Sequence, residues 1–209
     1  MLVDFTCREF LDELAAQSPA PGGGSVSALA GSLGGALVSM VARLTVGKEE
    51  FNPVREEMHE VVARAEELRS RLTGLIDRDT EAFNRVMGAY RLPKGTEAEK
   101  GARAQAIQEA MKNAALLPLE AAACCLDVLH LAREVVAKGT PNALSDGGVA
   151  ALMAYAGLRG ALFNVAINLA AIKDGAWIKG IKEQKGEIQD QGEAVYRQVI
   201  GEVEGKLSL

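Results

Sequence analysis

One uncharged stretch of small residues constrains the fold of this chain more than any other feature. The run SPAPGGGSVSALAGSLGGALVSMVARLTVGK extends from Ser18 to Lys48, and no charged residue occurs between Glu13 and Arg43. After its glycine-rich turn, the run predicts a helix from about Gly24 or Ser25 to Val46. Such a helix offers little to water on any side, so we expect it to be buried among other helices.

Small residues recur at every fourth position of this expected helix. Ser27, Gly31, Gly35 and Ser39 therefore share one face and would let another backbone approach closely. Each glycine inside a helix costs roughly 0.8–1 kcal/mol relative to alanine, so the glycines need a compensating reason. Tight helix packing, or room for a ligand beside the helix, would supply one.

A membrane span is the alternative for so long an uncharged stretch, because about 20 apolar residues cross a bilayer. Two prolines, three consecutive glycines and several serines argue against it. The second apolar stretch, residues 147–172, carries Arg159 at its middle, where lipid would make the charge costly. The N-terminal residues MLVDFTCREFLDEL carry acids where a signal peptide requires a basic start. We therefore expect a cytoplasmic protein with no membrane partner.

Composition excludes several classes of protein. Apolar residues make up 48% of the chain but aromatic residues only 4%, which favours closely packed helices over a β-sandwich. The net charge of −5 argues against a nucleic-acid partner, which requires a basic face. Cys7, Cys124 and Cys125 lack the spacing of a disulfide framework or a zinc site, and His59 and His130 have no nearby ligand. We expect no metal.

The helix signals predict an all-α fold. We expect one domain over residues 1–209, folded as an antiparallel up-and-down bundle of five long helices plus a short N-terminal helix. Thr6 and Thr96, each followed three residues later by a glutamate, form capping boxes, and Asn52 with Pro53 would start the third helix. The expected helices end near Ala16, Val46, Tyr90, Lys138, Ile172 and Lys206. The last of them is rich in charge and is expected to be a solvated outer helix.

The third helix has a regular apolar stripe with one interruption. The stripe comprises Met58, Val61, Ala65, Leu68, Leu72, Leu75, Ala82, Val86 and Ala89. Asp79 occupies the position where the pattern requires another apolar residue. Burying an ion costs several kcal/mol unless partners compensate, so an acid at a core position usually pairs with a cation or serves chemistry. Alternatively, the buried part of the helix ends near Ile76 and Asp79 is solvated.

Polar residues are sparse on the later apolar helices. Glu120 is the only charged residue between Lys112 and Asp127, either as a paired structural acid or as a substrate contact. Asp146 and Asn164 are in helical phase, but they are separated by about 27 Å along a straight helix. If both serve a site, they contact opposite ends of a long ligand or belong to different copies of the site in a dimer.

Three segments of the chain resemble the cyclodeaminase and methenyltetrahydrofolate cyclohydrolase family. They are residues 18–48, then DRDTEAFNRVMGAYRLPK, residues 77–94, and SDGGVAALMAYAGLRGALFNVAINLAAIKD, residues 145–174. The family is that of the C-terminal domain of bifunctional formiminotransferase-cyclodeaminase and of single-domain bacterial cyclohydrolases. The resemblance implies a metal-free helical bundle that forms a homodimer, needs no cofactor, and binds a reduced folate, a tetrahydrofolate derivative, as substrate.

The resemblance implies chemistry at the one-carbon bridge between N5 and N10 of the folate. In a cyclohydrolase, water attacks the cationic 5,10-methenyl carbon and yields 10-formyltetrahydrofolate. This step requires an acid-base group near one carbon and a negative field that opposes the cation. Asp79 is the first candidate for both roles. Asp146 is the second, although Ser-Asp-Gly-Gly at a helix start is equally well explained by capping.

Other residues are candidates for substrate binding. The folate tail is anionic, so Arg43, Lys48 and Lys94 are candidate clamps. The pterin edge suits hydroxyl and amide groups, which are supplied by the candidates Ser25, Asn142, Asn164 and Asn168.

Two alternative functions stay open. A cyclodeaminase would form the same bridged cation from 5-formiminotetrahydrofolate with release of ammonia. The sequence shows no fused formiminotransferase domain, which favours the cyclohydrolase. From another class, the chain would be a non-catalytic helical dimer or a folate-binding module. Exposure of Asp79 to solvent and the absence of a concave site beside Arg43 would favour this alternative.

Overall fold

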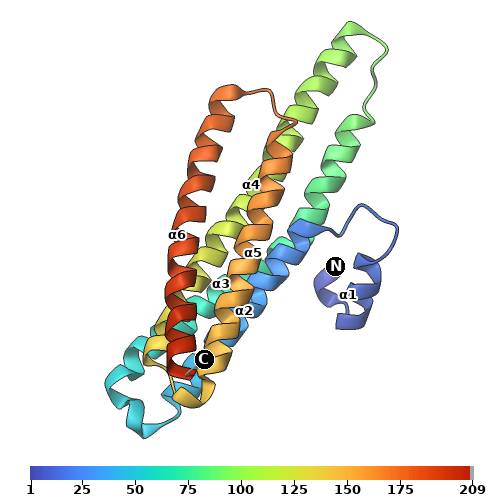
Figure 1. Cartoon of the computed structure of the whole chain (residues 1–209). Helices are drawn as coiled ribbons and strands as arrows, with labels where there is room; N and C mark the ends of the chain where they lie inside the picture. The colour runs from blue at the N-terminus through green and yellow to red at the C-terminus, as the bar shows by residue number, and fades with distance from the viewer. Residues whose placement is uncertain (208–209) are drawn as a thin grey trace.

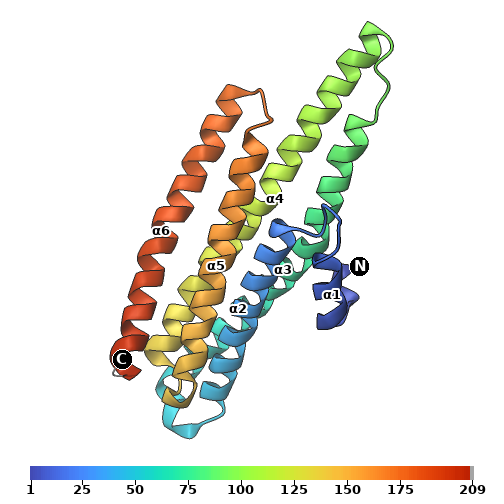
Figure 2. The same cartoon turned by 45° about the vertical axis from the view of Figure 1, so that its right-hand side comes forward.

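The computed structural model describes residues 1–207, which form six α-helices joined by turns and three short 3-10 helices, with no strand. The long helices run alternately up and down, and the short first helix lies against the side of the bundle (Figures 1 and 2). The predicted fold class is therefore confirmed. The helices are α1 (Cys7–Leu14), α2 (Gly23–Val46), α3 (Arg55–Tyr90), α4 (Glu97–Lys138), α5 (Leu144–Leu169) and α6 (Gly175–Leu207).

The small residues of α2 bring neighbouring backbones into contact. A Cβ atom added at Gly157 of α5 would lie 2.7 Å from the carbonyl oxygen of Ser27 and 3.0 Å from the nitrogen of Gly31. One added at Gly35 would lie 3.5 Å from the carbonyl oxygen of Ala65 on α3. The close packing expected from the four-residue spacing is thus confirmed, against α5 on one side and α3 on the other.

The apolar stripe of α3 forms much of the core. Every predicted member of the stripe is buried, from Met58 to Ala89, and packs mainly against Ala, Leu and Val side chains of α2, α4 and α5. Leu72 and Met58 have no exposed surface at all. The stripe is interrupted only at Asp79, as the sequence indicates.

One predicted helix start is wrong. Asn52 does not cap α3, which begins at Arg55, because residues Glu49–Val54 instead form a 3-10 helix (η2) that contains Pro53. A residue that precedes proline disfavours the α conformation, so the α-helix starts only after this turn. The capping boxes at Thr6 and Thr96 are present as predicted.

The N-terminal arm, residues 1–16, packs on α2 and α3. Its helix α1 buries Phe10 in the main core, and the backbone N–H of Leu2 donates to Oδ1 of Asp77 at 2.5 Å. A 3-10 helix, η1 (Leu2–Asp4), precedes α1. The arm is therefore attached to α3 one helical turn or less from Asp79.

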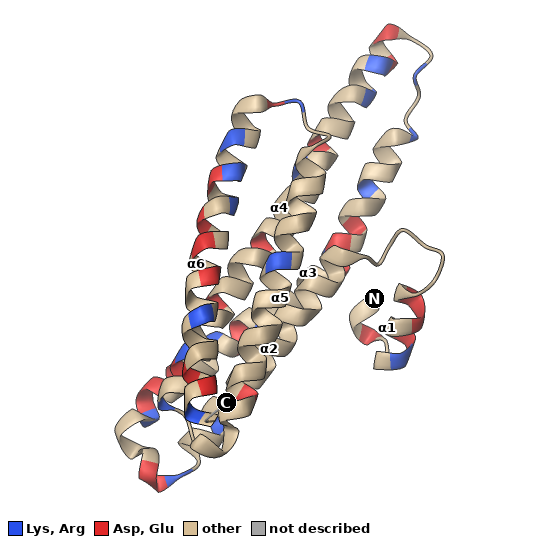
Figure 3. Ribbon diagram, viewed as in Figure 1, with Lys and Arg blue, Asp and Glu red and all other residues tan. Residues whose placement is uncertain are grey.

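Helix α6 is the outer helix of the bundle. It packs against α4 and α5 through a narrow apolar stripe, and it carries many charged residues along its length (Figure 3), most of them exposed. Its buried apolar residues are Ile181, Val195, Val199 and Val203. The prediction of a solvated last helix is confirmed.

Candidate functional site

A cavity of about 220 Å³ lies where α2 begins, enclosed by the linker before α2 and by residues of α3, α4 and α5. The linker before α2 forms one wall with Pro19, Ala20 and the glycines 22–24, and α3 contributes Asp79 and Phe83. Met111 of α4 and two asparagines of α5 form the other side. This cavity contains the only carboxylate that interrupts the core pattern of α3, so it is the candidate site for acid-base chemistry.

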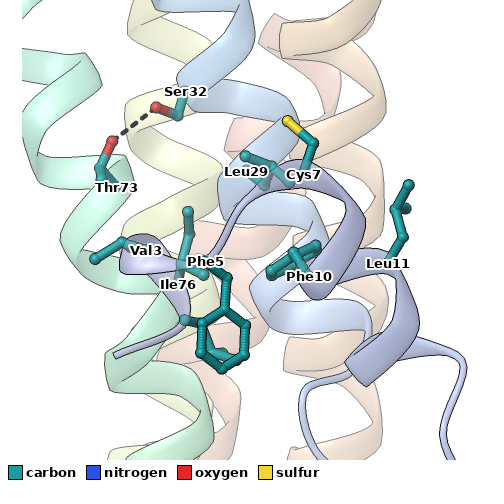
Figure 4. Close-up of a pocket in the computed structure, with 10 residues that line it drawn as sticks. Val3, Phe5, Cys7, Phe10, Leu11, Leu29, Ser32, Thr73 and Ile76 are labelled. Carbon is teal, nitrogen blue, oxygen red and sulfur yellow. Dashed lines mark hydrogen bonds between the residues drawn. The ribbon is translucent and has the colours of Figure 1, made fainter.

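A larger hollow of about 340 Å³ lies between the N-terminal arm and helices α2 and α3 (Figure 4). Its walls are nearly all apolar, and its polar groups are Cys7 and a hydroxyl pair in which Ser32 Oγ and Thr73 Oγ1 are 2.8 Å apart. No carboxylate, histidine or cationic side chain lines it. The smaller cavity is therefore the better candidate despite its size.

The Asp79 carboxylate lies against the first turn of α2. Its Oδ2 accepts the backbone N–H of Ser25 at 3.1 Å, and the Ser25 hydroxyl lies 3.4 Å away while donating to the carbonyl of Ile76 at 2.8 Å. The N-cap residue of α2 is Gly22, which has no side chain to bind these N–H groups. Asp79 supplies the missing acceptor from a neighbouring helix, at the positive end of the α2 dipole.

Burial raises the pKa of Asp79 above the usual range of a carboxyl, and the hydrogen bonds from Ser25 oppose this shift. No cation is hydrogen-bonded or ion-paired to this carboxylate within the described chain. A partly buried aspartate without a cationic partner is suited to accept a proton or to stabilise a cationic ligand.

The glycine turn exists because side chains would collide with this site. A Cβ atom at Gly24 would lie 2.1 Å from Oδ1 of Asp79, and one at Gly23 would lie 3.1 Å from Nδ2 of Asn164. Contacts below 3 Å force a neighbour to move, so glycine at position 24 is required for Asp79 to reach the helix. The glycine-rich turn before α2 thus forms part of the cavity wall.

Two amides form the wall opposite Asp79. Asn164 donates from Nδ2 to the carbonyl of Gly160 at 2.9 Å, and Asn168 donates to the carbonyl of Ala114 at 2.7 Å. These bonds orient both side chains, leaving each amide oxygen and a second N–H available for a ligand. Ser25, Asp79, Asn164 and Asn168, named from the sequence, therefore meet at one end of the bundle.

Four other candidates lie at the opposite end. Lys48 donates to Thr140 Oγ1 at 2.9 Å beside the C-terminal end of α2, and Asn142 and Asp146 occupy the start of α5. The rise along α2 from Ser25 to Arg43 is about 27 Å. Within one chain, these residues and the cavity do not share a site.

Arg43 is held in a surface ion-pair cluster. Its Nε donates to Ser39 Oγ at 3.1 Å, and its Nη2 lies 3.5 Å from Glu66. The hydrogen bond from Ser39, followed by that from Arg69, lowers the pKa of Glu66 to about 2. The cluster gives Arg43 a structural explanation that requires no ligand.

The last two candidates lie outside the cavity wall. Lys94 is exposed in the loop between α3 and α4. Glu120 is ion-paired with Arg71 at 3.5 Å and with Arg78 at 3.4 Å and does not line the cavity. Of the two explanations for Glu120, the paired structural acid therefore fits its surroundings.

Comparison with known proteins gives this arrangement a context. The sequence profile described as formiminotransferase-cyclodeaminase matches residues 6–187, which include every cavity-lining residue. The chain belongs to this family.

Members of the formiminotransferase-cyclodeaminase family match along nearly the whole chain. The methenyltetrahydrofolate cyclohydrolase of Methylorubrum extorquens is 46% identical over 95% of this chain and 97% of its own length. The formimidoyltransferase-cyclodeaminase of Rattus norvegicus is 34% identical over 98% of this chain, which spans 38% of the rat protein. The crystal structure of formiminotetrahydrofolate cyclodeaminase from Thermotoga maritima superposes with a TM-score of 0.89 at 33% identity, covering 99% of this chain and 100% of that one.

Several residues that line the cavity were not predicted from the sequence. Phe83 lies four residues after Asp79, so the helical period alone could have placed it on the same face. Met111 and Ala114 belong to the next helix, and finding them requires the register of the α3–α4 pair. The described residues hold no group of three or more His, Cys, Asp and Glu side chains arranged for a metal ion.

Proposed function

We propose that this chain is a methenyltetrahydrofolate cyclohydrolase that converts 5,10-methenyltetrahydrofolate to 10-formyltetrahydrofolate. The observation that carries the proposal is the Asp79 carboxylate, held without a cationic partner in a cavity of amides, apolar side chains and main chain. The 46% identity with the Methylorubrum cyclohydrolase over nearly the full length of both chains supports the choice of reaction.

In the proposed mechanism, Asp79 opposes the charge of the bridged cation and receives a proton. The oxygen of water forms a bond with the bridging carbon while a water proton passes to the carboxylate. The bond from that carbon to N5 then breaks, N5 takes the proton back from Asp79, and the remaining hydroxyl proton leaves to solvent as the formyl group forms on N10. The reaction consumes only water, so we propose that it needs no cofactor or metal.

The asparagines and Ser25 complete the proposed site. The free amide groups of Asn164 and Asn168 would bind the donor and acceptor edge of the pterin. Ser25 keeps Asp79 in place through its backbone N–H. Three other candidates could reach this cavity only from a second copy of the chain. They are Asp146, the second catalytic candidate, with Asn142 and Lys48.

Cyclodeaminase activity is the second candidate. The structural similarity to the Thermotoga cyclodeaminase favours it, and the same carboxylate could serve the attack of N10 and the departure of ammonia. One pair of assays separates the two functions: loss of methenyltetrahydrofolate absorbance and release of ammonia from 5-formiminotetrahydrofolate. Hydrolysis without ammonia release supports the cyclohydrolase, and ammonia release alone supports the deaminase. Folate binding without either activity would support a non-catalytic binding module.

We also propose that the protein forms a homodimer through α2 and α5. These adjacent helices expose many apolar side chains. They also carry almost no Lys, Arg, Asp or Glu (Figure 3). The exposed residues include Val26, Leu33, Met40 and Leu44 on α2, and Val149, Leu152, Phe163 and Ile167 on α5. So extensive an apolar face on a monomer is unusual and marks an interaction surface.

Light scattering after size exclusion tests the dimer. We expect twice the mass of one chain, and Leu33→Glu should shift the protein toward the monomer. Leu116→Glu is the matched control, because Leu116 is exposed on α4, outside the proposed interface. A monomeric wild-type protein would overturn this part of the proposal.

We propose that the protein is cytoplasmic and that its apolar helices do not span a membrane. Three segments, Gly23–Val46, Glu97–Lys138 and Pro141–Leu169, are long and apolar enough to cross a bilayer by length and composition. Within the bundle, 61% and 72% of the apolar windows of the first two are already buried by other helices. The third is 44% buried, and its free face would be covered by the second subunit. The acidic net charge likewise supports a protein without a nucleic-acid partner.

A further inference from the structure

The cavity is too small for a complete reduced folate. Pockets that enclose ligands of this size have volumes of about 300–1,000 Å³, whereas this cavity measures about 220 Å³. With the pterin and its one-carbon bridge beside Asp79, the aminobenzoyl-glutamate portion must lie outside. The question is which surface receives its carboxylates.

The α3–α4 hairpin continues past the cavity, beyond the start of α2 (Figures 1 and 2). On α3, Tyr90 follows Asp79 by 11 residues, which places both on the same helical face about 16 Å apart. On α4, Arg103 precedes the cavity residue Ala114 by 11 residues and lies in the same phase. The cavity face of both helices therefore leads to Tyr90 and Arg103.

These two residues contact each other. The Arg103 guanidinium donates from Nε and Nη2 to the carbonyl of Tyr90, at 3.2 and 2.9 Å, and lies 5.7 Å from the centre of its ring. Nη1 takes no part in these bonds. The side chain is thus fixed on the hairpin with one edge available to an anion.

The hairpin is the basic part of an acidic protein. Residues 85–112 carry six Lys and Arg against three Glu, in a chain whose net charge is −5. The cations lie on both arms of the hairpin (Figure 3). Arg85, Arg91 and Lys94 are exposed. An anionic group leaving the cavity along this hairpin would meet a local positive field.

The reach of the substrate fits this position better than the other end of the bundle. Standard bond lengths give roughly 9–12 Å from N10 across the aminobenzoyl ring to the glutamate carboxylates. That length extends along α3 from the level of Asp79 to residues 85–87, about one helical turn before Tyr90 and the Arg103 guanidinium bound to it. Arg43 of the same chain lies about 27 Å from Ser25 in the opposite direction.

We infer that Arg103, fixed over Tyr90 on the α3–α4 hairpin, binds the glutamate carboxylates of the folate and makes the enzyme select substrates with an anionic tail. This inference rests on the proposed function for the identity of the ligand. It names a specificity-determining residue that the sequence did not indicate, and it assigns to Arg43 a structural role within its own chain.

The test compares two substrates, 5,10-methenyltetrahydrofolate and the corresponding methenyltetrahydropteroate, which lacks the glutamate. Arg103→Ala should raise KM for the folate about tenfold with little change in kcat, because a charge-assisted contact made equally in ground and transition states is lost. KM for the pteroate should stay within twofold of wild type. Arg103→Lys, which keeps the charge but not the fork, should fall between the two.

Arg133→Ala is the matched control, an arginine on the same helix about 45 Å from Arg103. It should change neither KM. An unchanged folate KM in Arg103→Ala, an equal rise for both substrates, or a tail-specific rise in Arg43→Ala instead would each overturn the inference.

Calorimetric titration with tetrahydrofolate and tetrahydropteroate separates this inference from the proposed function. If wild-type protein turns over neither methenyl compound, the proposed function fails. Tighter binding of tetrahydrofolate that disappears in Arg103→Ala would still support the tail site, and equal binding of the two by wild type would overturn it.

Discussion

The carboxylate of Asp79 accepts the backbone N–H of Ser25 at 3.1 Å, so a residue of α3 occupies the capping position at the start of α2. The same group is partly buried, and burial raises its pKa. The Asp79 side chain therefore caps the start of α2 and also lines the cavity with a group that can accept a proton. Variants that keep the cap and remove the proton acceptor distinguish these two roles.

Asp79→Asn should lower turnover by at least tenfold, and a loss of about 100-fold or more is typical of a missing general base. The amide oxygen of asparagine can still accept the Ser25 N–H, so the variant should fold. Initial rates of methenyltetrahydrofolate hydrolysis measure the effect, with circular dichroism as the check on folding. Asp77→Asn is the matched control, because Asp77 binds Leu2 of the N-terminal arm and should affect turnover by less than twofold. Full activity of Asp79→Asn would remove this residue from the chemistry.

The raised pKa of Asp79 predicts a pH-dependent difference in stability. In the window between about 3.9, the ordinary carboxyl value, and the higher folded value, the folded state binds more protons than the unfolded state. The contribution of Asp79 to the free energy of unfolding is therefore fully present at low pH and is lost as pH rises through the folded pKa. Relative to wild type, Asp79→Asn should gain thermal stability from pH 4 to pH 7. A constant difference in Tm across this range would contradict the expectation.

Gly24→Ala should damage activity through Asp79. The added methyl group would lie 2.1 Å from Oδ1, so the carboxylate must leave the α2 terminus or the helix must shift. We expect at least a tenfold loss of turnover in a folded protein. Gly74→Ala on α3, where no atom lies within 4 Å of the new methyl group, should keep full activity and gain up to about 1 kcal/mol of stability. Equal activity of the two variants would show that Asp79 does not need its position.

Gly157→Ala should weaken the packing of α5 on α2. Its methyl group would meet main-chain atoms of Ser27 and Gly31 at 2.7 and 3.0 Å, and backbone cannot move aside as a flexible side chain can. The expected cost is about 1–3 kcal/mol in the free energy of unfolding, measured with denaturant. Gly180→Ala on α6 has open space around it and should be neutral or slightly stabilising. A neutral Gly157→Ala would mean that the helices separate without cost.

The sequence predicted most of the fold because the signals were local and repeated. The α3 stripe identified its own buried face over more than eight turns, and the capping boxes marked two helix starts. The failure at Asn52 and Pro53 also has a local cause, since a cap and a proline fit a 3-10 turn as well as the start of an α-helix.

The site was less accessible to sequence reasoning. Asp79 was found because it interrupts a periodic pattern, whereas Asn164 and Asp146 share a helical phase although they lie at opposite ends of α5. Phase specifies the face of a helix but not the position along it that faces a cavity. Met111 and Arg103 depend on the register between two helices, which no single helix encodes.

Three of the five linker residues that line the cavity are glycines, so this part of the wall has main chain and no side chains. Main-chain groups are the same for every amino acid, and position 24 admits no side chain while Asp79 stays in place. A change of substrate or reaction within this architecture therefore has few positions open to it. Variation must concentrate on the opposite wall, at Met111, Asn164 and Asn168, and libraries that aim to alter the chemistry should begin with those three codons.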